Sequence, residues 1–289
     1  MNTRALQAFV CVAENDSFSV AAEQLHLTQP AVSKRVATLE KELETPLFDR
    51  IGHKISLTEA GRQLLPRAQH MLLEMADIRR SISNLTGDIS GTLTMGTSHH
   101  VGLHRLPSAL KAFSQKYPRV SLDIRFMDSE SACNAVEHGE LELAIVTLPT
   151  HPGTNLSTTS IWPDPLCFVV APYHPLAAID APGLADLIHH PAVLVAKGTY
   201  TREILEEALK PFRLPLQIGM ATNYLETLRM MVSIGLGWSL LPESMIKGDD
   251  LQVLNIKELR LSRRLGAVTH KDRTLSNAAQ AMVEVCRGG

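Results

Sequence analysis

The sequence predicts an α+β protein in three parts: a small helical domain that ends in a hairpin, one long helix, and a larger α/β domain. With 289 residues, the chain is about twice as long as a domain of roughly 150 residues, so more than one compact unit is expected. Helical periodicity dominates the first part, and from Thr92 onward short apolar strands alternate with helices that have one apolar face. We place the three parts at residues 1–58, 59–89 and 90–289.

Three short helices and a hairpin are predicted in the first part. The helices are expected at residues 5–15, 19–25 and 28–43, and the strands at 48–50 and 55–57 around a turn at 51–54. A short turn joins the second and third helices, as in a helix-turn-helix unit. Small apolar side chains allow these two helices to cross closely: Ala21, Ala22, Leu25, Val32 and Val36. Thr28 is placed to cap the third helix, and Pro30 suits its first turn.

The start of the third helix carries side chains that suit DNA. Gln29 and Ser33 can form hydrogen bonds with bases, and Lys34 and Arg35 can reach phosphates or guanine. The acidic residues of this helix lie at its other end, so the net charge of -2 does not exclude DNA binding. The predicted contacts to double-stranded DNA from this unit are Thr28, Gln29, Pro30, Ser33, Lys34 and Arg35. The apolar spacing alone would also fit an ordinary helical hairpin.

The long helix, expected at residues 58–85, carries a heptad stripe. The stripe consists of Leu64, Ala68, Met71, Met75, Ile78, Ile82 and Leu85. Such a pattern is typical of a helix that pairs with a second copy, so we predict dimerisation here. Two recognition helices would then bind the two halves of an imperfect palindrome. The alternative is that the stripe packs against the chain's own α/β domain. Pro66 is expected to bend or break this helix near its start.

The α/β domain is expected to have mainly parallel sheets, because helices separate most of its strands. It is also long enough for two lobes. Strands are predicted at 92–96, 121–126, 142–147, 166–171, 192–195, 216–221, 238–241 and 265–269. Helices are predicted at 106–116, 131–138, 202–209, 225–234 and 275–287.

The blocks around the helix-turn-helix unit carry a family resemblance. The segments 40–50 (EKELETPLFDR) and 57–61 (LTEAG), together with 17–35, closely resemble the DNA-binding domain of LysR-type transcriptional regulators. The resemblance implies a winged helix-turn-helix in which Arg50 and Lys54 contact phosphates. One departure is Glu44, where the family usually has a glycine at the end of the recognition helix.

The rest of the chain resembles the effector domain of the same family, which is similar to a two-lobed periplasmic binding protein. The matching segments are 90–93, 106–118, 139–145 and 235–242. The resemblance implies lobe one at 90–162 and 268–289, and lobe two at 163–267. It further implies a sequence-specific regulator that senses a small molecule and assembles into a homotetramer, built as a dimer of dimers.

The effector is expected beyond the carboxyl ends of the strands, where helix N-termini direct backbone donors into the cleft. By position in the family, the predicted contacts are Ser98, His99, Ser129, Thr147, Thr199 and Asn223. Hydroxyl groups beside backbone N–H donors suit a small carboxylate. Arg202 either adds a positive charge to this site or is solvated.

Other functional classes find little support in the sequence. His100 and His104 have the spacing of two metal ligands on one helix face, but no third ligand is recognisable, so we predict neither metal nor cofactor. Ser108 and Lys111 match one element of the acyl-serine enzymes without its companion elements, so no enzyme is expected. No apolar run approaches about 20 residues and no signal segment is evident, which predicts a cytoplasmic protein without a membrane partner.

The four cysteines, Cys11, Cys133, Cys167 and Cys286, lie far apart in the sequence. This spacing fits neither a disulfide framework nor a paired-cysteine metal or redox site. We therefore expect buried thiols. Because the predicted lobe two contains no cysteine besides Cys167, peroxide sensing through a disulfide within that lobe is not expected.

Overall fold

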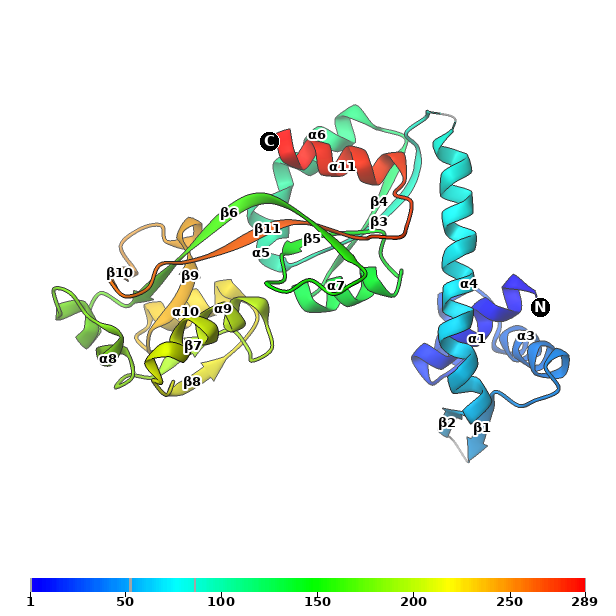
Figure 1. The fold of residues 1–289 in the computed structure, drawn as a ribbon, viewed down its shortest axis with the longest axis horizontal. Helices are drawn as coiled ribbons and strands as arrows, with labels where there is room; N and C mark the ends of the chain where they lie inside the picture. The colour runs from blue at the N-terminus through cyan, green and yellow to red at the C-terminus, as the bar shows by residue number, and fades with distance from the viewer. Residues whose placement is uncertain (1, 52–53, 86, 289) are drawn as a thin grey trace. The chain divides into compact units, whose positions relative to one another are not determined.

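A computed structural model describes residues 2–51, 54–85 and 87–288 of the chain. The fold divides into two compact units, Met1–Thr86 and Gly87–Gly289. The first unit is mainly helical and the second is α/β (Figure 1). The predicted α+β fold class is therefore confirmed.

The N-terminal unit contains the predicted helices and hairpin. Its elements are α1 (Thr3–Asn15), α2 (Phe18–Gln24), α3 (Gln29–Glu42), the antiparallel strands β1 (Phe48–Ile51) and β2 (Lys54–Leu57), and α4 (Glu59–Asn84). The small side chains predicted at the crossing of α2 and α3 lie in one core, where Ala21, Val32 and Val36 are completely buried. The expected turn residues Gly52 and His53 lie outside the described part of the chain.

The end of α3 shows how the chain accommodates Glu44 in place of a glycine. The backbone of Glu44 is left-handed, with φ of 51°. The N–H groups of Glu44 and Thr45 donate to the carbonyls of Lys41 and Glu40 at 3.3 and 3.1 Å, which is the hydrogen-bond pattern of a Schellman cap. The cap is therefore intact, although a residue with a Cβ pays a conformational penalty in this region.

Helix α4 runs without interruption from Glu59 to Asn84 with Pro66 inside it. The predicted break near Pro66 is wrong. The first half of α4 packs Leu64, Leu65 and Ala68 against the N-terminal core. Because a proline removes one backbone hydrogen bond, this packing on both sides of Pro66 can hold the helix together. The bend that Pro66 was expected to cause in α4 is not tested by these observations.

The second unit is built on a mixed sheet. Within the described residues, one sheet has seven strands in the order β10-β6-β11-β5-β3-β4, with β9 also paired to β6, and a second sheet pairs β7 with β8. The strands are β3 (Gly91–Thr97), β4 (Val120–Phe126), β5 (Leu143–Thr147), β6 (Leu156–Val170), β7 (Ala192–Leu194), β8 (Ile218–Ala221), β9 (Ser239–Pro242), β10 (Gln252–Leu254) and β11 (Leu261–His270). The helices are α5 (His99–His104), α6 (Leu106–Lys116), α7 (Ser129–Glu137), α8 (Leu184–Leu187), α9 (Tyr200–Leu209), α10 (Leu225–Ser233) and α11 (Asn277–Gly288).

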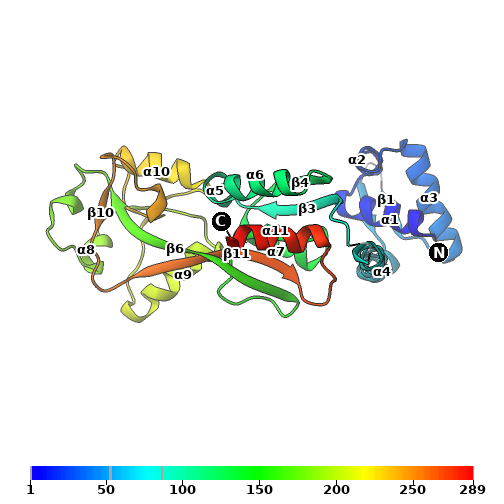
Figure 2. The same cartoon turned by 90° about the horizontal axis from the view of Figure 1, so that it is seen from above.

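The expectation of mainly parallel sheets is wrong for this unit. Strands β3, β4 and β5 are parallel, as are β7 and β8. Strands β6 and β11, however, pair antiparallel with each other, and β11 also pairs antiparallel with β5. These two long strands run side by side between the two halves of the unit (Figures 1 and 2). The proposed lobe boundaries at 162/163 and 267/268 fall within β6 and β11.

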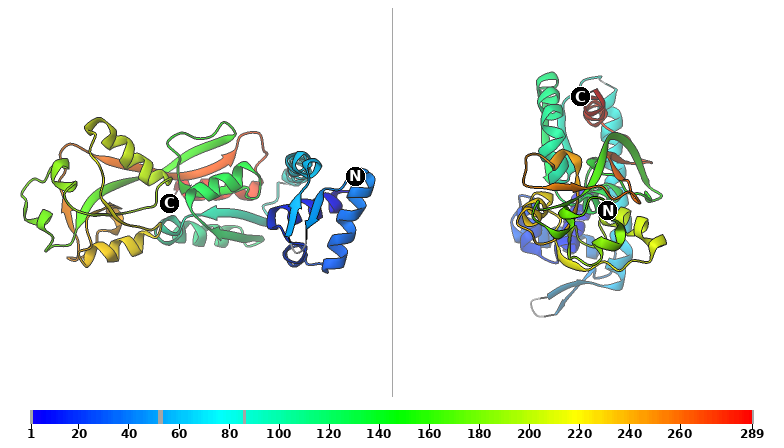
Figure 3. Two further views of the ribbon diagram at one scale, coloured as in Figure 1. Left: turned by 90° about the horizontal axis from the view of Figure 1, so that it is seen from below. Right: turned by 90° about the vertical axis from the view of Figure 1, so that its left-hand side faces the viewer.

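Each half of the unit has its own apolar core. One includes Leu93, Phe113 and Ile145, and the other includes Phe168 and Trp238, so the crossing strands join two separately packed bodies, which we call the lobes (Figure 3). Where β11 crosses β6, the pairing shifts between Leu265 and Gly266. A Cβ on Gly266 would lie 2.1 Å from the carbonyl oxygen of Thr159, which explains the glycine. No helix in the described residues is long and apolar enough to span a membrane.

Candidate functional site

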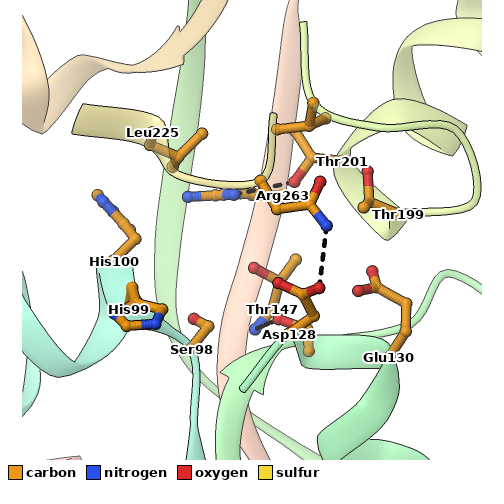
Figure 4. A pocket seen from close by; sticks show the side chains of 13 residues that line it. Ser98, His99, His100, Asp128, Glu130, Thr147, Thr199, Thr201, Leu225 and Arg263 are labelled. Atoms are coloured by element: carbon orange, nitrogen blue, oxygen red, sulfur yellow. Dashed lines mark hydrogen bonds between the residues drawn. The ribbon is translucent and has the colours of Figure 1, made fainter. Parts of the chain in front are cut away.

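All six residues predicted to contact an effector line one cleft in the second unit (Figure 4). Because β3, β4 and β5 are parallel, their carboxyl ends bring Ser98, Ser129 and Thr147 to the same edge of the sheet. Thr199 and Asn223 approach from the other lobe. The cleft encloses about 470 Å³, part of it open to solvent. Whether these residues bind a ligand stays a prediction.

The lobe-one side of the cleft carries the side chains of Ser98, Ser129 and His99. Within the described part of the chain, the side chain of Ser98 makes no cap hydrogen bond, although Ser98 precedes α5 at its N-cap position. Ser129 Oγ accepts the backbone N–H of Thr147 at 3.2 Å. The ring of His99 packs against Phe126 and Tyr224, with centroid distances of 5.5 and 5.0 Å. Ser98 is therefore available for a ligand, whereas Ser129 partly serves the fold.

Two hydrogen bonds cross the cleft between the lobes. Asn223 Nδ2 donates to Asp128 Oδ2 at 2.9 Å (Figure 4), and the backbone N–H of Tyr200 donates to Glu130 Oε1 at 2.6 Å. Burial raises the pKa of Glu130. Thr199 caps α9, since its Oγ1 accepts the N–H of Arg202 at 3.3 Å. The acidic groups of the cleft therefore already have partners from the opposite lobe.

A buried cluster around Asp164, which was not predicted from the sequence, lies next to the cleft. Arg263 Nε and Arg105 Nη2 donate to the two carboxylate oxygens of Asp164 at 2.8 and 3.1 Å. Arg263 Nη1 donates to Thr201 Oγ1 at 2.9 Å. Asp164 is 1% exposed and Arg263 is 5% exposed. Burial lowers the pKa of Arg263, and the charge of Asp164 acts in the opposite direction.

Arg263 lines the cleft, and its Nη2 atom is buried without a hydrogen-bond partner among the described residues. The arginine considered from the sequence, Arg202, is instead buried and donates to Glu206 at 2.7 Å. It does not line the cleft. Arg263 was missed because its partner Asp164 is 99 residues away. The sequence signal that could have found it is a pair of arginines inside an apolar strand.

His100 is a second buried polar residue of the cleft. It is 5% exposed, and neither ring nitrogen has a hydrogen-bond partner in the described structure. Burial, followed by the positive charge of Arg263, lowers the pKa of His100 to about 4. The ring is therefore neutral near pH 7.

The predicted DNA-reading side chains gather at the start of α3. Thr28, Gln29, Pro30 and Lys34 are exposed, and Ser33 and Arg35 are half-buried. Thr28 occupies the N-cap position, but its side chain makes no cap hydrogen bond among the described residues, which differs from its predicted role. Its backbone carbonyl accepts from Ala31 and Val32 instead. The side chains of Arg50 and Lys54 lie outside the described part of the structure.

The heptad stripe of α4 divides into two parts. Ala68 is fully buried and Leu64 partly buried in the core of their own unit, and the sulfur of Met75 accepts the hydroxyl of Thr3 at 3.3 Å. By contrast, Met71, Ile78, Ile82 and Leu85 are 42%, 56%, 63% and 85% exposed. A contiguous row of exposed apolar side chains is typical of an interaction surface. Ala68 packs inside its own unit and is therefore not accessible to a partner helix.

Three of the four cysteines are buried, as expected, and Cys167 is the exception. Cys11, Cys133 and Cys286 are buried, and Cys167 is half-buried. Burial raises the pKa of Cys133 and Cys286 to about 11, and it also raises the pKa of Cys167. Because the thiolate is the reactive form, none of these three is activated.

Comparison with known families gives two matches that together span nearly the whole chain. The family model described as the LysR substrate binding domain matches residues 86–289. The model described as a bacterial regulatory helix-turn-helix protein of the lysR family matches residues 3–62.

Individual relatives agree with these matches. An uncharacterized HTH-type transcriptional regulator of Azotobacter vinelandii, encoded in an ibpB-leuC intergenic region, is 61% identical over 107 residues, which are 37% of this chain and 74% of that protein. A full-length OxyR variant from Pseudomonas aeruginosa has a TM-score of 0.73 at 24% identity, covering 99% of this chain and 95% of the other. CbnR in complex with its target DNA has a TM-score of 0.63 at 22% identity, covering 100% and 99%. The two structures show similarity of fold.

Proposed function

The chain belongs to the LysR family of bacterial transcriptional regulators, and from this premise we propose that it binds a palindromic DNA site under the control of a small carboxylate. The family resemblance expected from the sequence is thus confirmed. LysR regulators bind DNA and effectors, they oligomerise, and they are not enzymes. For this chain we propose the contact residues, the class of effector and the dimer described below.

The observation that carries the effector class is the free donor of Arg263. A guanidinium matches a carboxylate in geometry and charge, and Arg263 Nη2 has no hydrogen-bond partner in the described structure. Ser98 adds a hydroxyl to the same cleft. An anion would contact both lobes, because Ser98 lies in one lobe and Thr199 in the other. Its binding would favour the closed cleft and thereby shift the equilibrium between DNA-binding states.

A thermal-shift screen tests the effector proposal. We expect small carboxylic acids, among them shikimate, to raise the melting temperature, because a ligand that binds the folded state stabilises it. The rise should be roughly 5–10 °C at a ligand concentration about 100-fold above Kd. Shikimate is included because the effector domain of QuiR was solved with it. Ser98→Ala should weaken the shift, and Ser114→Ala, an exposed serine on α6, should leave it unchanged.

Shifts produced by neutral metabolites but by none of the acids would refute the carboxylate. They would leave the DNA-binding part of the proposal intact.

The proposed DNA contacts come from the start of α3. Within the described part of the chain, the side chains of Gln29, Lys34 and Arg35 make no hydrogen bond or ion pair, so they are available to a partner. Thr28, Pro30 and Ser33 complete the proposed contact surface, and Arg50 and Lys54 of the hairpin are proposed to contact phosphates. A dimer through α4 would present two such surfaces to an imperfect palindrome.

Replacing Arg35 with alanine is expected to weaken DNA binding by about tenfold or more, since a contact to a base or phosphate is lost at each half-site. Affinity for the chain's own upstream DNA would be measured by gel shift. Light scattering should show an unchanged oligomer, and Lys111→Ala on α6 of the α/β unit, which also removes one exposed positive charge, serves as the control. Unchanged affinity would remove Arg35 from the proposed interface.

A further inference from the structure

At the edge of the cleft, two helices from different lobes bring together three side chains of types that can bind a metal ion. His100 and His104 lie one turn apart on α5, and Glu226 lies in the first turn of α10. One ligand atom from each residue lies within 4.8 Å of the other two. His104 Nε2 is 3.0 Å from Glu226 Oε1, and the centroids of the two imidazole rings are 4.9 Å apart.

His100 provides a second, independent observation. Its ring is buried, and both nitrogens lack a hydrogen-bond partner among the described residues. Buried polar atoms in native proteins nearly always have a partner, so each exception needs an explanation. Asp164 Oδ2 lies 3.9 Å from His100 Nε2. This distance is too long for a hydrogen bond, but a small shift would let Asp164 accept from the ring, as carboxylates do that orient a metal-bound histidine.

We propose that His100, His104 and Glu226 bind a divalent transition-metal ion such as Zn²⁺, and that the ion links the two lobes. None of these three residues is among the proposed carboxylate contacts, although His100 lines the same cleft. Two imidazoles and one carboxylate form a typical donor set for zinc, with a fourth position left for water or another ligand. Ligand atoms around tetrahedral Zn²⁺ lie roughly 3.3 Å apart. The His104 and Glu226 atoms already meet this spacing at 3.0 Å, and the separations to the His100 nitrogen, at most 4.8 Å, need to shorten by up to about 1.5 Å.

The required movement is small for these side chains. His104 and Glu226 have 38% and 40% of their side-chain surface exposed, so both can change rotamer without disturbing a core. The third ligand also explains why no metal was predicted from the sequence, since Glu226 is separated from His104 by 122 residues. Only the meeting of α5 and α10 places it beside the histidine pair.

The charges around the site determine the affinity that we expect for the metal ion. Arg105 and Arg263 both lie near His100, but they donate to Asp164 rather than to the histidine. Their positive charges disfavour a cation, and Glu226 is the single carboxylate among the three ligands. We therefore expect micromolar affinity rather than the tighter binding of a structural zinc site, and a strong dependence on the charge of Glu226.

The test uses the full-length chain, stripped of metal with a chelator, and Zn²⁺ alone as the probe. Isothermal titration should give one ion per chain. Either His104→Ala or Glu226→Gln should weaken binding by about 100-fold, because each removes a direct ligand. The matched control is His138→Ala. His138 is an exposed histidine at the C-terminal end of α7 and lies outside the cluster. Co²⁺ would report the ligand geometry through its visible spectrum.

Circular dichroism would first establish that both exposed-site variants fold, which is why buried His100 is left unchanged. One-to-one binding that is lost in both variants and kept in His138→Ala supports the site. Two results overturn it: no saturable binding by the unmodified chain, or equal binding by Glu226→Gln and the unmodified chain.

Discussion

Replacing Asp164 with asparagine is expected to lower the free energy of unfolding of the α/β unit by about 3–5 kcal/mol, the usual cost of breaking a buried ion pair from one side. Asp164 is 1% exposed and accepts hydrogen bonds from Arg263 and Arg105. Asparagine keeps the size of the side chain but removes its charge. The guanidinium of Arg263, which is 5% exposed, would then be a buried cation without a counter-ion.

Urea unfolding followed by tryptophan fluorescence would measure this loss. Both tryptophans, Trp162 and Trp238, lie in the α/β unit, so the signal reports on that unit and not on the DNA-binding domain. The control is Asp123→Asn, which breaks an exposed pair with Arg125 and should cost no more than about 0.5 kcal/mol. A loss below about 1 kcal/mol for Asp164→Asn would contradict the importance of the buried cluster.

A double variant separates the charge effect from a packing effect. Adding Arg263→Met to Asp164→Asn removes the unpaired buried cation, so stability should recover toward that of the unmodified chain. Arg105 does not need to be replaced, because 28% of its side-chain surface is exposed and water can solvate it. Absence of any recovery would show that the cost of Asp164→Asn arises from lost shape and not from the unpaired charge.

The same cluster shows where prediction from sequence stopped. Local periodicity predicted α1, α2, α3 and α4, because each of these elements is specified by residues three and four apart. Ser98, Ser129 and Thr147 were expected together because of their positions in the resembled family and because parallel strands end at one edge of the sheet. Arg263 and Asp164 belong to different strands, and no local sequence pattern predicts that charged residues so far apart in the sequence will form an ion pair.

The lengths of the two crossing strands, β6 and β11, were predicted too short for a related reason. Strand β6 was predicted from residue 166, yet it begins at Leu156, and the missed half contains Pro163, Asp164 and Pro165, residues that are rare in strands. Strand β11 was likewise predicted without Arg263 and Arg264, which lie in its first half. In both cases the polar residues that weakened the strand signal lie where the chain passes between the lobes, and two of them form the buried ion pair.

The second large effect is expected for Ile78→Glu, which should convert the proposed α4 dimer into separate chains. Ile78 is 56% exposed in the described structure, in the row that continues through Ile82 and Leu85. A partner helix would bury these residues, and a pair of facing glutamates would place two like charges in that apolar seam. Light scattering would measure the mass. His70→Glu, an exposed position outside the stripe on the same helix, should stay associated.

DNA binding should fall with the loss of the dimer. Two linked recognition helices gain about 10²–10⁴ in affinity over one, because the second contact becomes intramolecular. We therefore expect Ile78→Glu to weaken binding to the full palindrome by about 100-fold or more, and to have little effect on binding to a single half-site. A variant that remains dimeric would show that Ile78 is not in the interface.

The salt dependence of DNA affinity distinguishes a variant that has lost its dimer partner from one that has lost a DNA-contacting side chain. The slope of log affinity against log salt concentration is proportional to the number of phosphates contacted. A single chain of Ile78→Glu contacts one half-site, so its slope should be about half that of the dimer, even though every DNA-contacting residue is present. Arg35→Ala should instead keep the dimer and reduce the slope by about one unit for each lost phosphate contact. If Ile78→Glu were monomeric yet retained the full slope, the second recognition helix would not be touching DNA, and the palindrome proposed for this regulator would be wrong.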